Sequence, residues 1–168
     1  MKAIIVGAGI GGICTALMLH RHGIACEIYE QAAEIRELGV GLTLLPHAVK
    51  ELAGLGLLAE LDRVAIRSAH LYYMTRRGQG VWDEPRGVGA GYDVPQFFIH
   101  RGRLQSVLHE ALRERLPAGA IRLDRRLTGY RQDGAGVAAT FADRDGGTHA
   151  AEGDVLIGAD GLHSAVRR

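Results

Sequence analysis

The feature that most constrains this chain is a short apolar run followed at once by closely spaced glycines. Residues 3–6 (AIIV) are continuously apolar, as expected for a strand buried on both faces of a parallel sheet. Gly7, Gly9 and Gly12 follow in G-x-G-x-x-G spacing. The first glycine permits a tight turn, the second lets a pyrophosphate approach the backbone, and the third lets the next helix pack closely on the strand. This spacing predicts a dinucleotide-binding turn.

The residues after the glycines complete a βαβ unit. Apolar residues at helical spacing predict a helix over 10–22 with Gly23 as its C-cap, and residues 25–29 predict a second strand. Glu30 ends that strand, where a carboxylate can accept hydrogen bonds from both hydroxyls of a ribose. Strand, glycines, helix, strand and acid together are a far more specific signal than the glycines alone. The alternative is a βαβ unit whose glycines serve packing only.

Composition narrows the class of protein. The chain has 168 residues, of which 47% are hydrophobic, and a net charge of +1. Clustered basic residues typical of nucleic-acid binding are absent, and no apolar run is long enough for a membrane span. Because the first strand begins at Lys2, we expect no signal peptide. Cys14 and Cys26 lack the spacing of a metal site or a redox pair, so we expect buried reduced thiols, no metal and a cytoplasmic protein; catalysis by a cysteine is the alternative.

Two further segments are candidates for ligand contact. Residues 39–44 (GVGLTL) form a glycine-bracketed apolar segment, which either presses its backbone against a flat ring or bends the chain between elements. Pro46 then predicts the start of a helix. Arg101 begins a predicted helix directly after the strand 97–99, a position that favours an anionic ligand. An unpartnered surface arginine is the alternative.

Residues 69–74 and 80–82 predict an antiparallel hairpin around the turn 75–79. A hairpin between α/β units often belongs to a second layer or a small second domain. Its aromatic residues either line an aromatic cavity or pack across the strands; they are Tyr72, Tyr73 and Trp82.

The last third of the chain predicts a strand at 121–123, a three-stranded meander and a closing strand. The meander strands are 127–131, 137–141 and 148–151. The closing strand, from Asp154, ends in Asp160-Gly161, where a carboxylate faces the ligand crevice of an α/β sheet or simply closes a turn. Ser164 is placed to start a helix.

Four motifs in register resemble the FAD-dependent aromatic hydroxylases of the para-hydroxybenzoate hydroxylase type. They are GAGIGG with Glu30, GVGLTLLPHAVKELAGLGL, IHRGRLQSVLHEAL and DVLIGADGLHSAVR. The span VWDEPRGVGAGYDVPQFFIHRGRLQ looks especially like the phenazine hydroxylases of this family. The resemblance implies a set of FAD-contacting residues: Gly7, Gly9, Ile10, Gly11, Gly12, Glu30, Gln31, Arg36, Val40, Gly41, Arg101, Gln105, Asp160 and Gly161.

The resemblance also implies a fold and a reaction. The expected fold is α/β: a Rossmann-like FAD-binding sheet, an antiparallel meander and part of a substrate-domain hairpin. Residues 1–68 and 97–168 would form two parts of the FAD-binding domain, and 69–96 the hairpin and loop of the substrate domain. The expected reaction hydroxylates a small phenolic or phenazine-like aromatic with O2 and NADH or NADPH. The resemblance assigns no catalytic residue. A homo-oligomer is expected on other grounds, because apolar surface of the sheet left uncovered at the chain end would favour self-association.

Family members continue for about as many residues again, so the chain resembles the N-terminal part of a longer enzyme. We expect this part alone to be inactive. The rival interpretation is an NAD-dependent Rossmann dehydrogenase or a non-catalytic nucleotide-binding module, since the glycines with Glu30 fit NAD equally well. The hairpin, the Arg101 helix and the Asp160-Gly161 strand end argue against it.

Overall fold

The computed structural model describes residues 1–35 and 39–168. The chain divides into two compact units, Met1–Arg36 with Leu108–Arg168, and Glu37–Val107. No helix among the described residues is both long and apolar enough to cross a membrane. Arg36, a predicted cofactor contact, lies outside the described residues.

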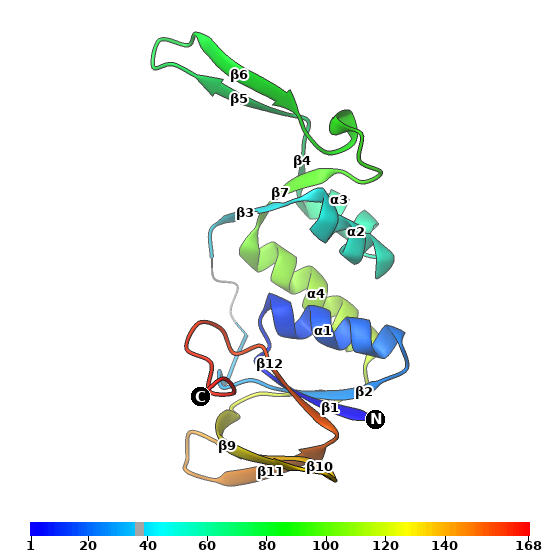
Figure 1. Ribbon diagram of the computed structural model, residues 1–168, viewed down its shortest axis with the longest axis vertical. Helices are drawn as coiled ribbons and strands as arrows, with labels where there is room; N and C mark the ends of the chain where they lie inside the picture. The colour runs from blue at the N-terminus through cyan, green and yellow to red at the C-terminus, as the bar shows by residue number, and fades with distance from the viewer. Residues whose placement is uncertain (36–38) are drawn as a thin grey trace. The chain divides into compact units, whose positions relative to one another are not determined.

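The first unit is built on a parallel sheet of order β12-β1-β2-β8. Its strands are β1 (Lys2–Val6), β2 (Ala25–Tyr29), β8 (Ile121–Arg122) and β12 (Val155–Gly158). The α1 helix (Ile10–Arg21) joins β1 to β2 and lies on one face of the sheet (Figure 1). Central β1 is buried along residues 3–6, because helix covers one face and a second sheet the other. The predicted βαβ unit and α/β fold class are confirmed.

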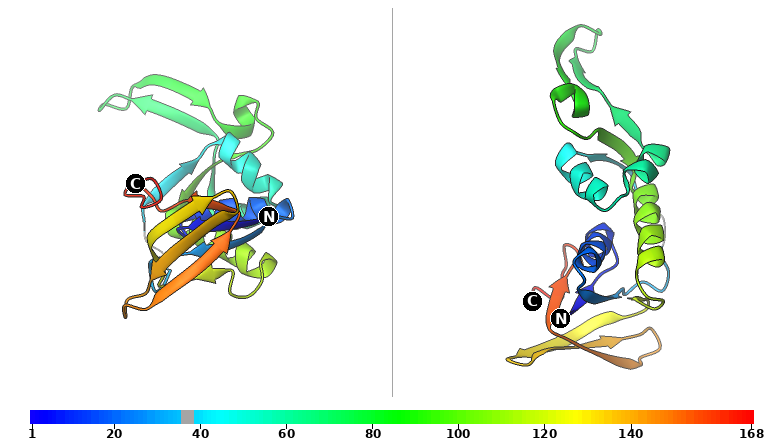
Figure 2. Two further views of the ribbon diagram at one scale, coloured as in Figure 1. Left: turned by 60° about the horizontal axis from the view of Figure 1, so that its bottom comes forward. Right: turned by 90° about the vertical axis from the view of Figure 1, so that its right-hand side faces the viewer.

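The second sheet of this unit is an antiparallel meander of order β11-β10-β9. It comprises β9 (Arg126–Asp133), β10 (Gly136–Ala142) and β11 (Thr148–Gly153), and it lies on the face of the parallel sheet opposite α1 (Figures 1 and 2). The Tyr29 ring stacks on Phe141 with centroids 4.2 Å apart. Ile4, Val6 and Leu127 join the same buried cluster, so apolar packing holds the two sheets together.

The second unit contains an antiparallel sheet of order β3-β7-β4. Its strands are β3 (Gly41–Leu44), β7 (Gln96–His100) and β4 (Ile66–Ser68), accompanied by helices α2 (Pro46–Gly54) and α3 (Leu58–Val64) and by the 3-10 turn η1 (Gly87–Ala90). Helix α4 (Arg101–Arg115) begins in this unit and continues into the first. The core of the second unit is aliphatic apart from one aromatic ring: Val49, Leu52, Leu55, Leu57, Leu61, Phe97, Ile99 and Leu104.

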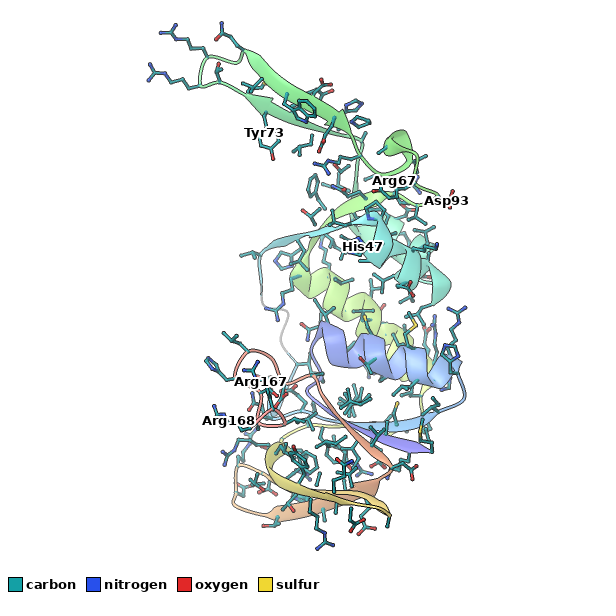
Figure 3. All side chains as sticks on the ribbon, viewed as in Figure 1. His47, Arg67, Tyr73, Asp93, Arg167 and Arg168 are labelled. Carbon is teal, nitrogen blue, oxygen red and sulfur yellow. The ribbon has the colours of Figure 1, made fainter. Side chains whose placement is uncertain are left out.

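The predicted hairpin is formed by β5 (His70–Met74) and β6 (Gly80–Pro85). Tyr73 lies directly opposite Trp82, so these two side chains share a face. Tyr72 lies opposite Asp83 and therefore projects from the other face. The alternative in which all three aromatics line one cavity is wrong for the hairpin itself, because adjacent residues of a strand alternate between its faces. Figure 3 shows Tyr73 projecting from the hairpin, and all three rings are exposed.

The helix expected from Ser164 does not form; residues 162–167 adopt turns instead. The Arg167 amide donates to Ser164 Oγ at 3.2 Å, as at a helix N-terminus, but the four residues after Ser164 allow at most one intrahelical hydrogen bond. The Asp160 carboxylate accepts hydrogen bonds from the Ser164 hydroxyl at 2.6 Å and from the Ala165 amide at 2.6 Å. Those donors fold the chain back over the end of β12, where Val166 packs close to Gly158.

Candidate dinucleotide-binding site

Two of the three motif glycines are required by the backbone around them. Gly7 has a φ of +104°, and its amide donates to the Tyr29 carbonyl at 2.8 Å. A Cβ on Gly7 would lie 2.5 Å from the Ala159 carbonyl oxygen, and a Cβ on Gly12 would lie 1.9 Å from the Gly7 carbonyl oxygen. These contacts bring the turn, α1 and the end of β12 together, as the first and third glycines of the motif predict.

Gly9 is different, because a Cβ added there would meet no atom of the described residues within 4 Å. Contacts with the rest of the described protein therefore do not require a glycine at position 9. Gly9 is the N-cap of α1, and no side chain caps this helix end and no acidic residue lies in its first turn. The amides that begin α1, at Ile10 and Gly11, therefore have no side-chain acceptor among the described residues, and an anion can accept from them. This arrangement fits a pyrophosphate.

Glu30 contacts the glycine turn directly. Its Oε2 accepts from the Ala8 amide at 2.7 Å, and its Oε1 accepts from the Ala32 amide at 2.8 Å. The sequence did not predict these contacts, although the G-x-G turn and the end of β2 had to lie at the same sheet edge. Each carboxylate oxygen retains a second lone pair, so the two amides leave capacity for ribose hydroxyls. Gln31 follows in an exposed bend.

Asp160 lies at the same edge, where the Ala159 amide donates to the Val6 carbonyl at 2.8 Å. Burial alone would raise the pKa of Asp160, but hydrogen bonds from Ser164, Ala165 and Val166 together hold that pKa below its ordinary value. The carboxylate therefore stays ionised at neutral pH and closes the 160–166 turn. Gly161 occupies that turn with a φ of +78°. A direct contact of either residue with a cofactor stays a prediction.

In the second unit the structure brings Val40, Gly41 and Arg101 together, although sixty residues separate them. Gly41 pairs with His100 across β3 and β7, and the Arg101 amide donates to the Val40 carbonyl at 3.0 Å. The Arg101 side chain packs on Gly39, where an added Cβ would lie 2.8 Å from Arg101 Cβ. The glycine before Val40 thus makes room for the arginine stem.

Two other side chains complete this second group. The Gly102 amide donates to His100 Nδ1 at 3.2 Å, so His100 helps to cap the start of α4. No local pattern around His100 predicted this contact. Gln105 lies one helical turn beyond Arg101 on the same side of α4 and is partly exposed.

The cysteines do not add a reactive group. Both are free and partly buried. Burial raises the pKa of the Cys14 thiol to about 11, and burial with the neighbouring Glu27 carboxylate raises that of Cys26. The thiolate form is therefore scarce at neutral pH. Within residues 1–35 and 39–168, no group of three or more His, Cys, Asp or Glu side chains could hold a metal ion.

Comparison with known proteins decides the family. A family model described as FAD binding domain matches residues 1–168. The chain belongs to the FAD binding domain family. The resemblance drawn from the four motifs is thereby confirmed, and FAD is the cofactor for which this family is named.

Relatives of this FAD binding domain are named as hydroxylases and monooxygenases. The chain is 44% identical over 167 residues to a phenazine 1,6-dicarboxylic acid hydroxylase, PhzS, of Lysobacter antibioticus, covering 98% of the chain and 41% of the relative. It is 30% identical to Klebsiella pneumoniae HpxO, solved with FAD and uric acid, with a TM-score of 0.77 over 99% of the chain and 41% of that structure.

A further solved structure supports the fold alone. The p-nitrophenol 4-monooxygenase PnpA of Pseudomonas putida DLL-E4 matches with a TM-score of 0.87 at 21% identity, covering 98% of the chain and 42% of that structure. The FAD binding domain described here thus spans about 41% of the length of the curated relative PhzS.

Proposed function

We propose that this chain is the FAD-binding part of a flavin-dependent monooxygenase that hydroxylates a small aromatic molecule with O2 and NADH or NADPH. The observation that carries the proposal is the open approach to Gly9 beside the uncapped start of α1, in a chain of the FAD binding domain family. The relative named as a phenazine dicarboxylic acid hydroxylase supports a phenolic or phenazine-like substrate. An NAD-dependent dehydrogenase gains no support from the relatives.

In this proposal the residues of the chain bind and orient FAD, which when bound supplies the redox chemistry. The amides at Ile10 and Gly11 donate to the pyrophosphate, and Glu30 accepts from the adenosine ribose while it holds the turn through Ala8. Val40 and Gly41 offer backbone to the flavin ring. Arg101 and Gln105 on α4, and Gln31, Asp160 and Gly161, are proposed as further cofactor contacts.

Glu30→Ala is expected to affect both stability and cofactor binding. Removing the carboxylate leaves the buried Ala8 amide without its acceptor, which costs about 1–3 kcal/mol of unfolding free energy. The lost ribose contact should weaken FAD binding by about tenfold or more. Urea unfolding and an FAD titration in the folded range measure the two effects separately. An unchanged FAD dissociation constant, with lowered stability, would show that Glu30 serves the turn alone.

Arg101→Lys is expected to impair flavin retention in the enzyme that contains this chain. A point charge cannot reproduce the guanidinium fork, whereas the aliphatic stem that packs on Gly39 is largely kept. Arg103→Lys is the matched control. Arg103 is exposed on α4, two residues after Arg101, and this variant should retain flavin. If Arg101→Lys changed only the apparent affinity for the aromatic substrate, Arg101 would belong to the substrate site.

The 168-residue chain alone is expected to give no coupled hydroxylation. Its relatives are more than twice as long, and a hydroxylating flavin needs a site closed to water. The test incubates the chain with FAD, NADH or NADPH and a panel of phenolic and phenazine substrates, with product and peroxide measured. Peroxide without product is the expected result. Product equal to the NAD(P)H consumed would overturn this expectation.

Location and assembly follow as further proposals. A cytoplasmic enzyme is supported by the two free cysteines. Self-association is supported by the exposed apolar side chains of the β5–β6 hairpin, which offer surface to a partner copy: Tyr72, Tyr73, Met74, Val81 and Trp82.

A further inference from the structure

A polar depression lies in the first unit, and residues 7–12 of the glycine turn are not part of its lining. It is a groove of about 510 Å³ lined by residues of β1, β2 and β11 and by the chain from Arg122 to Arg125. Lys2, Arg122 and Arg125 contribute cationic nitrogens, and Glu27 contributes the only carboxylate among the lining residues; His149 also lines the groove, with its Nε2 held by Asp143. The proposed FAD contacts do not include any of these residues. The groove therefore carries an excess of positive charge that the proposed function does not use.

Glu27 organises two of these cations. Its carboxylate lies 3.0 Å from Lys2 Nζ and 3.6 Å from a terminal nitrogen of Arg122, and it accepts from the Tyr29 hydroxyl at 2.6 Å. Burial favours the neutral acid, but the hydrogen bonds from Tyr29 and Lys2, with the charges of Lys2 and Arg122, hold the pKa of Glu27 below its ordinary value. One carboxylate thus orients two cations and neutralises only one of them.

Arg125 is positioned by the backbone rather than by an acid. One of its terminal nitrogens donates to the Asp124 carbonyl at 2.7 Å, and no carboxylate among the described residues forms an ion pair with it. Asp124 is the only non-glycine residue with a positive φ in the described chain, at +55°. This costly conformation is held because the Asp124 amide donates to the Ala32 carbonyl and the Arg125 amide to the Glu30 carbonyl. The strained turn places an unpaired guanidinium on the groove.

We propose that this groove binds a multivalent oxyanion of the phosphate class, as a site separate from the dinucleotide turn. Its cationic side chains come from three separate segments: Lys2 from β1, Arg122 from β8, and Arg125 from the turn before β9. A phosphate carries more negative charge than a single carboxylate and offers acceptor oxygens in a tetrahedral arrangement, so it can meet the cations whose charge Glu27 leaves uncompensated. His149, whose Nε2 lies 2.7 Å from Asp143 Oδ2, adds a ring at the β11 side.

The groove and the start of α1 belong to opposite sides of the parallel sheet. The groove is on the side of the parallel sheet that meets the meander, as the Tyr29–Phe141 stack shows, and α1 with its N-terminus covers the opposite side (Figure 1). A pyrophosphate bound at Gly9 therefore leaves the groove unoccupied. The inference does not depend on the hydroxylase proposal.

The test is a titration of the isotopically labelled 168-residue chain with inorganic pyrophosphate, inorganic phosphate and malonate at constant ionic strength. The readout is the NMR signals of the arginine Nε–H groups and the His149 ring, beside the backbone amides of residues 9–12, which report the dinucleotide turn. Arg125→Gln is the test variant, and Arg131→Gln, an exposed arginine of β9 in the same unit, is the matched control. The amide spectrum of each variant without added anion reports its folding.

We expect saturable shifts at Arg122, Arg125 and His149 with pyrophosphate, at least about tenfold weaker in Arg125→Gln and unchanged in Arg131→Gln. Saturable shifts confined to residues 9–12 would overturn the proposal. So would equal binding by Arg125→Gln, or tighter binding of malonate than of the phosphates. If Arg125→Gln did not fold, the wild-type titration with the Arg131→Gln control would still decide, since absence of saturable shifts at the groove refutes the site.

Discussion

Gly12→Ala is expected to lower the free energy of unfolding by about 3 kcal/mol or more. This equals or exceeds the largest loss that overpacking a protein core typically causes. The added Cβ would lie 1.9 Å from the Gly7 carbonyl oxygen, which is backbone and cannot move to another rotamer. Relief requires α1 to shift away from the turn that β1, β2 and β12 hold in place. Such a shift would also separate the helix amides from the site proposed for the pyrophosphate. Urea unfolding of the purified chain measures the loss.

Gly11→Ala is the matched control for this prediction. It adds the same methyl one residue earlier in the same helix, where nothing lies within 4 Å. Alanine favours a helix over glycine by up to about 1 kcal/mol, so the control should be as stable as the wild type or slightly more so. Equal unfolding free energies for Gly12→Ala and the wild type would mean that α1 does not pack on the turn as described.

Local sequence patterns predicted the parts of the fold that arise from short-range chemistry. The apolar run 3–6, the glycine spacing and the Glu30 position predicted a βαβ unit because each of these signals occurs within one strand, turn or helix. The Pro46 helix start and the 70–85 hairpin were predictable for the same reason. The Ser164 helix did not form, although the Arg167 amide donates to Ser164 Oγ as at a helix start, because the four residues after Ser164 allow at most one intrahelical hydrogen bond.

The rest of the candidate site depends on contacts that no local pattern encodes. The Glu30 carboxylate reaches the Ala8 amide only because β1 and β2 are adjacent and in register. Gly39 accommodates the Arg101 stem only because β3 pairs with β7. Glu30 and Arg101 were both predicted as cofactor contacts, and both also contact the backbone of a neighbouring segment. Substitution of either residue therefore tests two roles, and stability must be measured beside binding.

Gly9→Ala separates these two roles. The methyl enters open space, and because Gly9 has an ordinary extended backbone at the start of α1, the fold should keep its stability. The same methyl occupies the approach proposed for the pyrophosphate, so FAD binding should weaken by about tenfold or more, as for other lost contacts to a charged group. Gly129→Ala, on β9 and equally free of neighbours, is the matched control for both measurements.

FAD binding at the glycine turn is therefore tested by titrating FAD into the wild-type chain, Gly9→Ala and Gly129→Ala. Flavin fluorescence is the readout, at the same protein concentration for all three. We predict saturable binding of one FAD by the wild type and by Gly129→Ala, and binding at least about tenfold weaker by Gly9→Ala at unchanged unfolding free energy. Equal dissociation constants for all three proteins, or no FAD binding by the folded wild type, would contradict the claim that the glycine turn of this chain receives the cofactor.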